Sequence, residues 1–198
     1  MTKALIVIDV QESFRARPWW RAVSNPEIVT NVRRLVDAAR ASGDRVFWVL
    51  HTEPGSGGVF DPASEHVRLI EPLAPRDGEP VLTKTSRNAF TTTNLQQRLT
   101  EAGIRDLIVC GIQTEQCCET TARVAADLGY AVEFVTDATA TFPIQHRDAP
   151  HGQTVEDLLA DPRTLSTDDV VTRTEYALAG RFATIRGTAE LAGAPVPN

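Results

Sequence analysis

Residues 107–129, LIVCGIQTEQCCETTARVAADLG, decide the fold of this chain. The apolar run that opens the stretch is typical of a buried strand, and from about Glu119 the small and apolar residues have the spacing of a helix with one buried face. A short polar turn joins the two and ends in Cys117. A thiol at a strand-to-helix turn lies beside free backbone N–H groups and the positive end of a helix dipole, which lower its pKa. The stretch therefore predicts a nucleophilic cysteine with a depressed pKa.

The alternative interpretation of these thiols is packing, because free cysteine is among the most buried residue types. Packing suits Cys110, which lies inside the apolar run. For Cys117 and the adjacent Cys118, this stretch alone leaves packing and catalysis open, so the rest of the chain has to decide between them.

The composition favours one enzyme-sized domain, residues 1–198, acting on a small molecule. The 198 residues fall within the usual size of one domain, and 42% hydrophobic with 23% charged residues is ordinary for a globular protein. A formal net charge of −6 and the lack of any Lys/Arg-rich run argue against nucleic-acid and acidic-membrane partners, which both need a basic surface.

The ends and the cysteines of the sequence indicate a cytoplasmic protein. The N-terminal residues enter an apolar run without the pattern of a signal peptide, and nowhere do 18 apolar residues follow one another. Three cysteines, two of them adjacent, do not form a disulfide framework. We therefore expect reduced thiols and neither a leader nor a membrane span.

Strand-like and helix-like segments alternate along the whole chain. The pattern predicts an α/β fold, a Rossmann-like three-layer sandwich with a central, mostly parallel sheet and helices on both faces. Besides the two elements of the opening stretch, we expect strands at residues 3–10, 45–52, 79–84, 131–136 and 182–185, and helices at 27–42, 92–102, 154–159, 168–178 and 188–191. Residues 14–26 are predicted to form an irregular loop, a turn is expected to begin at Asp137, and residues 53–78 give no firm prediction.

A carboxylate follows the first apolar run directly. Asp9 comes at or near the carboxyl end of a predicted central strand, which is where open α/β sheets gather their ligands. Aspartate is equally common as a turn or capping residue. Its place behind five apolar residues favours a functional role.

Three sequence blocks, in this order, resemble the isochorismatase-like cysteine hydrolases. They are VIDVQESF at residues 7–14, LTKTSRNAFTTTNL at 82–95 and GIQTEQCCETTARVA at 111–125. The resemblance covers roughly residues 3–142 and is weaker at the C-terminus, whereas residues 143–165 match nothing in the family pattern.

The resemblance implies a catalytic triad, which carries out amide hydrolysis through a covalent intermediate. Cys117 would attack the carbonyl carbon to give a thioester, Asp9 would be the general base, and Lys84 would stabilise the thiolate and orient Asp9. An isolated lysine is most often a solvated surface residue, but Lys84 stands between an apolar strand and a family block. Cys118 occupies a position where relatives usually carry valine, so we interpret it as packing.

The same resemblance implies an oxyanion hole made by backbone N–H groups of Gln113 and Cys117, with a cis peptide bond between Ile112 and Gln113. Many relatives carry a small residue at the position of Gln113, so their substrates do not transfer directly to this chain. Isochorismatases proper lack the nucleophilic cysteine and cleave a vinyl ether, so Cys117 argues against that reaction.

Neither a metal nor another cofactor is predicted. Nicotinamidases of the superfamily begin their metal site with Asp-x-His, whereas this chain has Val49, Leu50 and His51, with no histidine pair close behind. His51 is therefore expected to be a polar wall or a structural residue. The missing metal motif argues against nicotinamide as the substrate. Carboxamide, ureido or carbamoyl, and lactam compounds remain as candidate substrates.

The predicted pocket and its surroundings complete the hypothesis. Residues 143–165 are longer than an ordinary connection and are predicted to form a lid or insertion at the pocket mouth, with His146 or His151 bordering it, rather than a plain surface excursion. A homo-oligomer, dimer or tetramer, is expected from the resemblance and from two loop tryptophans. The candidate pocket residues are Gln11, Phe14, Trp19, His51, Phe90, Gln116, Phe142 and His146.

Two other functions agree with parts of the sequence. A non-enzymatic redox sensor would use Cys117 and Cys118 as a pair of low-pKa thiols, but it gives no role to Asp9 or Lys84. A phosphatase-like hydrolase with Asp9 as nucleophile needs a second aspartate two residues further on, where this chain has Gln11.

Overall fold

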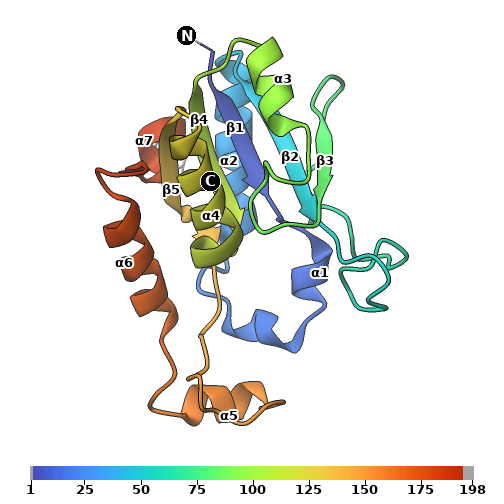
Figure 1. Cartoon of the computed structure of the whole chain (residues 1–198), viewed down its shortest axis with the longest axis vertical. Helices are drawn as coiled ribbons and strands as arrows, with labels where there is room; N and C mark the ends of the chain where they lie inside the picture. The colour runs from blue at the N-terminus through green and yellow to red at the C-terminus, as the bar shows by residue number, and fades with distance from the viewer. Residues whose placement is uncertain (1, 194–198) are drawn as a thin grey trace.

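A six-stranded sheet forms the centre of the molecule in the computed structural model, which describes residues 2–193 (Figure 1). The strand order is β3-β2-β1-β4-β5-β6, and every pairing is parallel. The predicted α/β fold with a parallel sheet is therefore confirmed. The strands are β1 (Ala4–Ile8), β2 (Arg45–His51), β3 (Val81–Lys84), β4 (Asp106–Ile112), β5 (Ala131–Ala140) and β6 (Thr184–Arg186).

The central strand shows why the apolar runs of the sequence become strands. All five residues of β1 are buried, and β1 pairs with β2 on one side and β4 on the other. A strand covered on both faces needs apolar side chains at every position, so it appears in the sequence as a continuous run rather than an alternating pattern.

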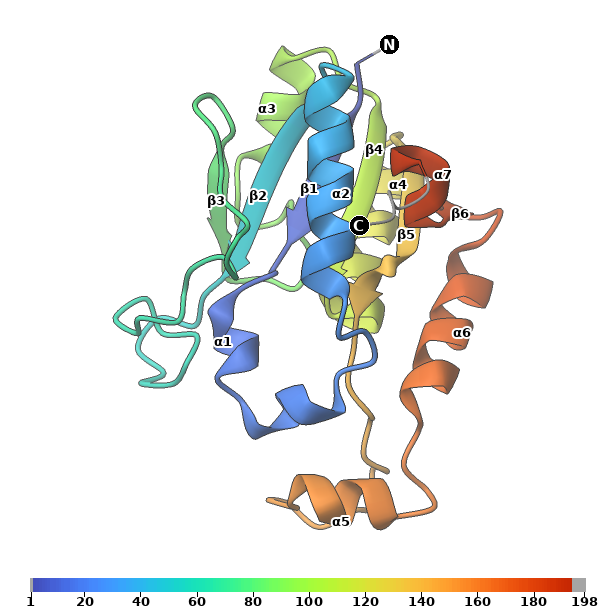
Figure 2. The same cartoon turned by 180° about the vertical axis from the view of Figure 1, so that it is seen from behind.

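Helices cover both faces of the sheet, as the three-layer prediction requires. On one face α2 (Ile28–Ala41) lies along the sheet with α7 (Thr188–Ala192) beside it (Figure 2). On the other face lie α3 (Leu95–Glu101) and α4 (Glu119–Asp127) (Figure 1). The core is accordingly divided: Leu5 of β1 packs in the cluster that contains α2, and Ile6 packs in the cluster that contains α3 and α4.

Two predictions at the level of elements were wrong. Residues 14–26 are not wholly irregular, because they contain the end of α1 (Glu12–Arg15) and a 3-10 helix, η1 (Pro18–Ala22), whose first residue has its φ preset by the proline ring. The expected turn at Asp137 is strand, since β5 continues to Ala140 and pairs again with the end of β4 after a shift of register.

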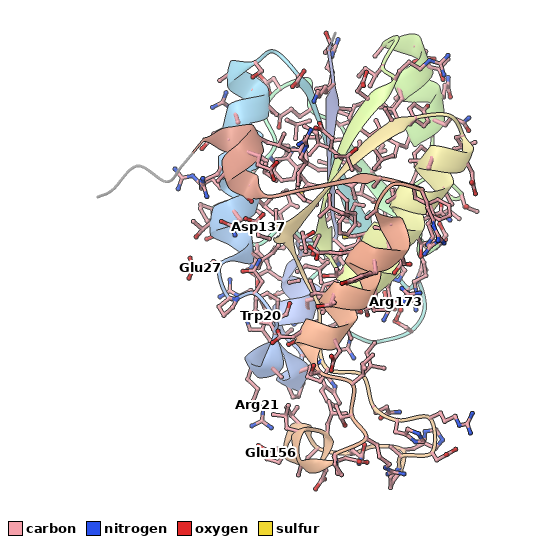
Figure 3. The ribbon with its side chains drawn as sticks, turned by 90° about the vertical axis from the view of Figure 1, so that its left-hand side faces the viewer. Trp20, Arg21, Glu27, Asp137, Glu156 and Arg173 are labelled. Atoms are coloured by element: carbon pink, nitrogen blue, oxygen red, sulfur yellow. The ribbon has the colours of Figure 1, made fainter. Side chains whose placement is uncertain are left out.

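The segment after β5 extends beyond the end of the sheet. It contains α5 (Val155–Ala160) and returns through α6 (Thr167–Leu178), which lies beside α4 (Figures 1 and 2). An ion pair of 2.5 Å between Arg21 of η1 and Glu156 of α5 joins the two short helices at this end (Figure 3). Between β2 and β3, residues 52–80 form no helix or strand.

Two further expectations concerned membrane spans and disulfide bonds. Within residues 2–193, no helix combines the length and the apolar character that crossing a membrane requires. The three cysteines, Cys110, Cys117 and Cys118, are free thiols.

Candidate active site

The carboxyl ends of β1, β3 and β4 bring together the three residues predicted to form the triad. Asp9 follows β1, Lys84 is the last residue of β3, and Cys117 lies in the turn after β4. Parallel strands end at the same edge of a sheet, which is why residues so far apart in sequence meet here. Lys84 is paired in register with His51 of β2, so its long side chain passes β2 to reach the end of β1.

One ammonium group lies at the centre of this site. Lys84 Nζ is 2.7 Å from Asp9 Oδ2, donates to Cys117 Sγ at 3.4 Å and donates to the backbone oxygen of Ser86 at 3.2 Å. The side chains of Asp9 and Lys84 are fully buried, and Cys117 is 5% exposed. A carboxylate, a cation and a thiol therefore share one buried site, which suits proton transfer from the thiol.

The local backbone fixes the position of the thiol. Gly111 has φ +131°, and a Cβ there would lie 1.9 Å from the backbone oxygen of Ile8, so only glycine fits between β4 and β1. The Ile112–Gln113 peptide bond is cis. Residues Thr114–Cys118 then form a single π-helical turn, η2, in which the Cys118 N–H donates to the Gln113 oxygen at 3.1 Å.

The electrostatics differ from the prediction for Cys117. Burial raises the pKa of the Cys117 thiol to about 12, and the Asp9 carboxylate adds to the effect, while Lys84 acts in the opposite direction. The predicted depression of this pKa by the turn and helix was wrong, because desolvation of the thiolate outweighs the favourable charge. The resting thiol is protonated, so it needs a base.

Asp9 has the properties of such a base. Burial raises its pKa to about 6, and the Lys84 charge limits the rise. At neutral pH the carboxylate is therefore ionised yet more basic than an ordinary aspartate, whose pKa is near 3.8. Asp9 also has φ 54°, in the left-handed region that few non-glycine residues adopt, and such strain is common at functional sites.

The other two cysteines are packing residues. Cys110 and Cys118 are both fully buried, and burial raises the pKa of each thiol well above its usual range. A redox sensor at Cys117 and Cys118 would need two thiols of low pKa. In this structure the pKa of both thiols is raised.

A cavity of about 600 Å³ opens onto the thiol. Five of the eight predicted pocket residues line this cavity, together with Asp9, Gln113 and Cys117. The five come from four separate segments of the chain. These five are Phe14, Trp19, His51, Gln116 and Phe142.

Three predicted pocket residues lie elsewhere. Gln11 is fully buried behind the wall, where its amide donates to the His51 oxygen at 3.0 Å and accepts from the His51 N–H at 2.8 Å. Phe90 stacks on Tyr130 in the core, with ring centroids 5.9 Å apart. His146 is outside the lining, on the exposed part of its segment.

Sequence reasoning missed much of the outer lining. Residues 143–165 do border the cavity, but through residues other than His146 and His151. An arginine three residues after Lys84, Arg87, and an aromatic residue behind a glycine-rich loop, Phe60, were the available signals for two of the missed positions. The lining residues not predicted are Arg17, Glu53, Gly58, Val59, Phe60, Arg87, Pro143, Ile144, Gln145 and Leu158.

His51 contacts three charged side chains, those of Lys84, Arg87 and Glu53. Its Nδ1 lies 3.4 Å from Lys84 Nζ, and burial, together with the charges of Lys84 and Arg87, lowers its pKa. In the part of the chain that the structure describes, no three His, Cys, Asp or Glu side chains gather closely enough to hold a metal ion.

Comparison with known proteins places this chain in a family. The model of the isochorismatase domain matches residues 3–160. The chain belongs to the isochorismatase family. It is therefore a hydrolase, as the three sequence blocks implied.

Curated relatives of this isochorismatase-family chain include two with named activities. A streptothricin hydrolase of Streptomyces noursei is 37% identical over 143 residues, with 72% of this chain and 56% of the relative covered. Nicotinamidase 3 of Arabidopsis thaliana is 34% identical, with 70% of this chain and 73% of the relative covered.

Solved structures show the same fold over nearly the whole isochorismatase-family chain. An isochorismatase from Pseudomonas putida KT2440 is 34% identical and superposes with a TM-score of 0.81, covering 96% of this chain and 89% of its own. A cysteine hydrolase from Pseudomonas syringae is 27% identical, with a TM-score of 0.80, 96% of this chain and 90% of its own covered.

Proposed function

We propose that the protein is a cysteine-dependent hydrolase that cleaves the C–N bond of a small carboxamide, ureido or carbamoyl compound, or lactam. The observation that carries the proposal is the buried Lys84 ammonium, which contacts both Asp9 Oδ2 and Cys117 Sγ at the wall of the cavity. A thiol, a base of raised pKa and a cation are the groups that this reaction needs.

In the first half-reaction, Cys117 Sγ forms a bond to the carbonyl carbon and its proton passes to Asp9. The tetrahedral intermediate then breaks its C–N bond, Asp9 returns the proton to the leaving nitrogen, and ammonia or an amine departs from a thioester. Backbone N–H groups of Gln113 and Cys117 are the proposed donors to the developing oxyanion.

In the second half-reaction, water attacks the thioester carbon and gives one proton to Asp9. The C–S bond breaks, the carboxylic acid leaves, and Asp9 returns the proton to the Cys117 sulfur. Lys84 keeps Asp9 ionised and stabilises the sulfur while it carries negative charge. Each cycle thus consumes one water and restores the thiol.

The relatives support C–N hydrolysis, since a nicotinamidase and a streptothricin hydrolase are among them. A vinyl-ether hydrolase remains a second candidate because the P. putida relative is described as an isochorismatase. The buried thiol at the cavity wall favours the first reaction, because vinyl-ether cleavage forms no bond to sulfur.

Trapping the intermediate tests the proposal. A panel of carboxamides, ureido acids and lactams is screened for release of ammonia or amine, and the protein is quenched with acid during turnover. We expect a mass increase equal to the acyl group, located on the peptide that contains Cys117 and removed by hydroxylamine. Turnover without any acyl adduct, or an adduct on Cys118, would contradict the mechanism.

The expected homo-oligomer, dimer or tetramer, is also a proposal. The expectation depended on the family resemblance and on the two loop tryptophans, Trp19 and Trp20. The Trp20 ring lies 6.4 Å from the Phe142 ring between centroids and is partly buried, so a contact with another subunit is not needed to cover it. Light scattering at micromolar concentration decides the matter, and a monomer would end this proposal.

A further inference from the structure

Two guanidinium groups line the same cavity as Cys117. Arg17 lies between α1 and η1, and Arg87 follows the end of β3. Within residues 2–193, no carboxylate forms an ion pair with either group, and neither guanidinium donates a hydrogen bond to an oxygen. Arg87 is exposed and Arg17 is half-buried, so water can satisfy their N–H groups while the cavity holds no ligand. A ligand that displaces this water has to offer acceptors, because a guanidinium has five N–H donors and no acceptor.

His51 is the nearest polar neighbour of Arg87, with Arg87 Nη1 3.3 Å from His51 Nε2, but it does not satisfy the guanidinium. Lys84 Nζ only donates and lies 3.4 Å from His51 Nδ1, so Nδ1 must be the acceptor and the ring proton is on Nε2. That Nε2–H has its own acceptor, Glu53 Oε1, at 3.4 Å. Two donors therefore face each other between Arg87 and His51.

The charges of the lining leave a positive excess. Asp9 is neutralised by Lys84, and burial, with Lys84 next in effect, lowers the pKa of His51 and keeps its ring neutral. Glu53 is the one remaining carboxylate of the lining, opposite the two guanidinium groups of Arg17 and Arg87. A neutral substrate would leave one cation of this cavity without a counter-charge.

The rest of the wall is aromatic. Phe14 contacts Phe60 edge to face, with ring centroids 5.0 Å apart, and stacks on Phe142 at 6.1 Å. These rings and Trp19 line the cavity on the side of η1 and the loop after β2. Apolar walls with a few polar groups are usual for a pocket that binds the body of a small molecule.

We infer that the substrate is an amide that also carries a carboxylate, held by Arg87 and Arg17, on an apolar body that packs against the phenylalanine cluster. The inference rests on the proposed C–N hydrolysis. An anion supplies the acceptor that His51 cannot provide, and a bidentate contact between a carboxylate and a guanidinium is a strong charge-assisted bond.

Two isosteric substrate pairs test this inference by turnover. The pairs are 4-carbamoylbenzoate with 4-isopropylbenzamide, and succinamate with 4-methylpentanamide, so that only the charge differs within a pair. We expect kcat/KM to favour the charged member of at least one pair by about 10-fold to 100-fold, the usual range for a charged hydrogen bond. Arg87→Gln should reduce this ratio, and the exposed, remote Arg33→Gln is the matched control that should preserve it.

Binding to Cys117→Ala, measured by calorimetry, separates the inference from the proposed function. The carboxylate site is supported if a charged member binds more tightly than its uncharged partner and if this difference is lost when Arg87→Gln or Arg17→Gln is added to Cys117→Ala. This result supports the carboxylate site even if no amide is turned over. In that event the C–N hydrolase proposal fails alone. Equal or absent binding of both charged members overturns the inference, whatever the turnover.

Discussion

The inner and outer halves of the cavity are built differently. The inner half holds Asp9, Lys84 and Cys117 at the ends of three strands of one sheet, where the surrounding core leaves them almost no solvent contact. The outer half comes from residues 14–19, 53–60 and 142–158, which are loops and short helices. The sheet edge thus positions the groups that we propose break bonds, whereas loops, which tolerate sequence change, form the rest of the cavity wall.

The largest effect should come from deleting the nucleophile in the inner half. Cys117→Ala is expected to lower kcat by roughly 10⁴-fold or more, because no other group can form the covalent bond. Cys118→Ala, its neighbour, should retain most of the activity and lose only about 1 kcal/mol of folding stability. Steady-state kinetics and thermal unfolding measure both, and equal losses of activity would remove the distinction between the two thiols.

The next largest effect concerns the buried ion pair. Asp9→Asn and Lys84→Met should each lose most of the rate, as members of one catalytic unit do, and each leaves its partner buried without a counter-charge at a cost of about 3–5 kcal/mol. The double variant should regain much of this stability and none of the activity. If stability did not recover in the double variant, the ion pair would not be the source of the loss.

A smaller effect follows from acidification. Asp9 acts as a base only when ionised, so kcat/KM should fall about tenfold per pH unit below its pKa of about 6. Because folding raises this pKa from 3.8, the stability contributed by Asp9 is greatest below pH 3.8 and is lost as the pH rises through about 6. Protonation of Asp9 near pH 5 should therefore inactivate the enzyme without destabilising the fold. Circular dichroism recorded at each pH of the rate profile checks this.

The smallest effect should come from the outer half. Replacing residues 145–152 with a short Gly/Ser linker removes Gln145 from the lining and should change KM and the ranking of substrates, by roughly tenfold or less. The rate at which iodoacetamide alkylates Cys117 should stay nearly constant, because the inner half is intact. An unchanged ranking, or a collapse of the alkylation rate, would show that the two halves are not independent.

That the residues of the inner half meet in space could be predicted from the sequence, because the local pattern of each segment and its place in the fold coincide there. Apolar runs covered on both faces become parallel strands, and a polar residue at the end of such a run must emerge at the shared edge of the sheet. Asp9 illustrates this, since it is the first charged residue after the five buried apolar residues of β1. Lys84 ends the short edge strand β3, in which exposed and buried residues alternate, and its prediction depended on the family block.

The outer half was less predictable because its residues meet only through tertiary structure. Phe60, Arg17 and Ile144 come from three segments with no repeating pattern, so nothing local shows that they share a wall. The raised pKa of Cys117 has a similar origin: the turn favours the thiolate, but the extent of burial, which decides the sign, depends on the whole fold.

Gly111 has a practical consequence for redesign of this enzyme. A methyl group at residue 111 would meet the backbone oxygen of Ile8, and a backbone atom, unlike a flexible side chain, cannot turn aside. Mutational libraries that aim at new substrates should therefore hold residues 8–9 and 111–117 constant. Diversity is better placed at the loop positions around Phe60 and Ile144, where a change of side chain leaves the spacing of the two central strands untouched.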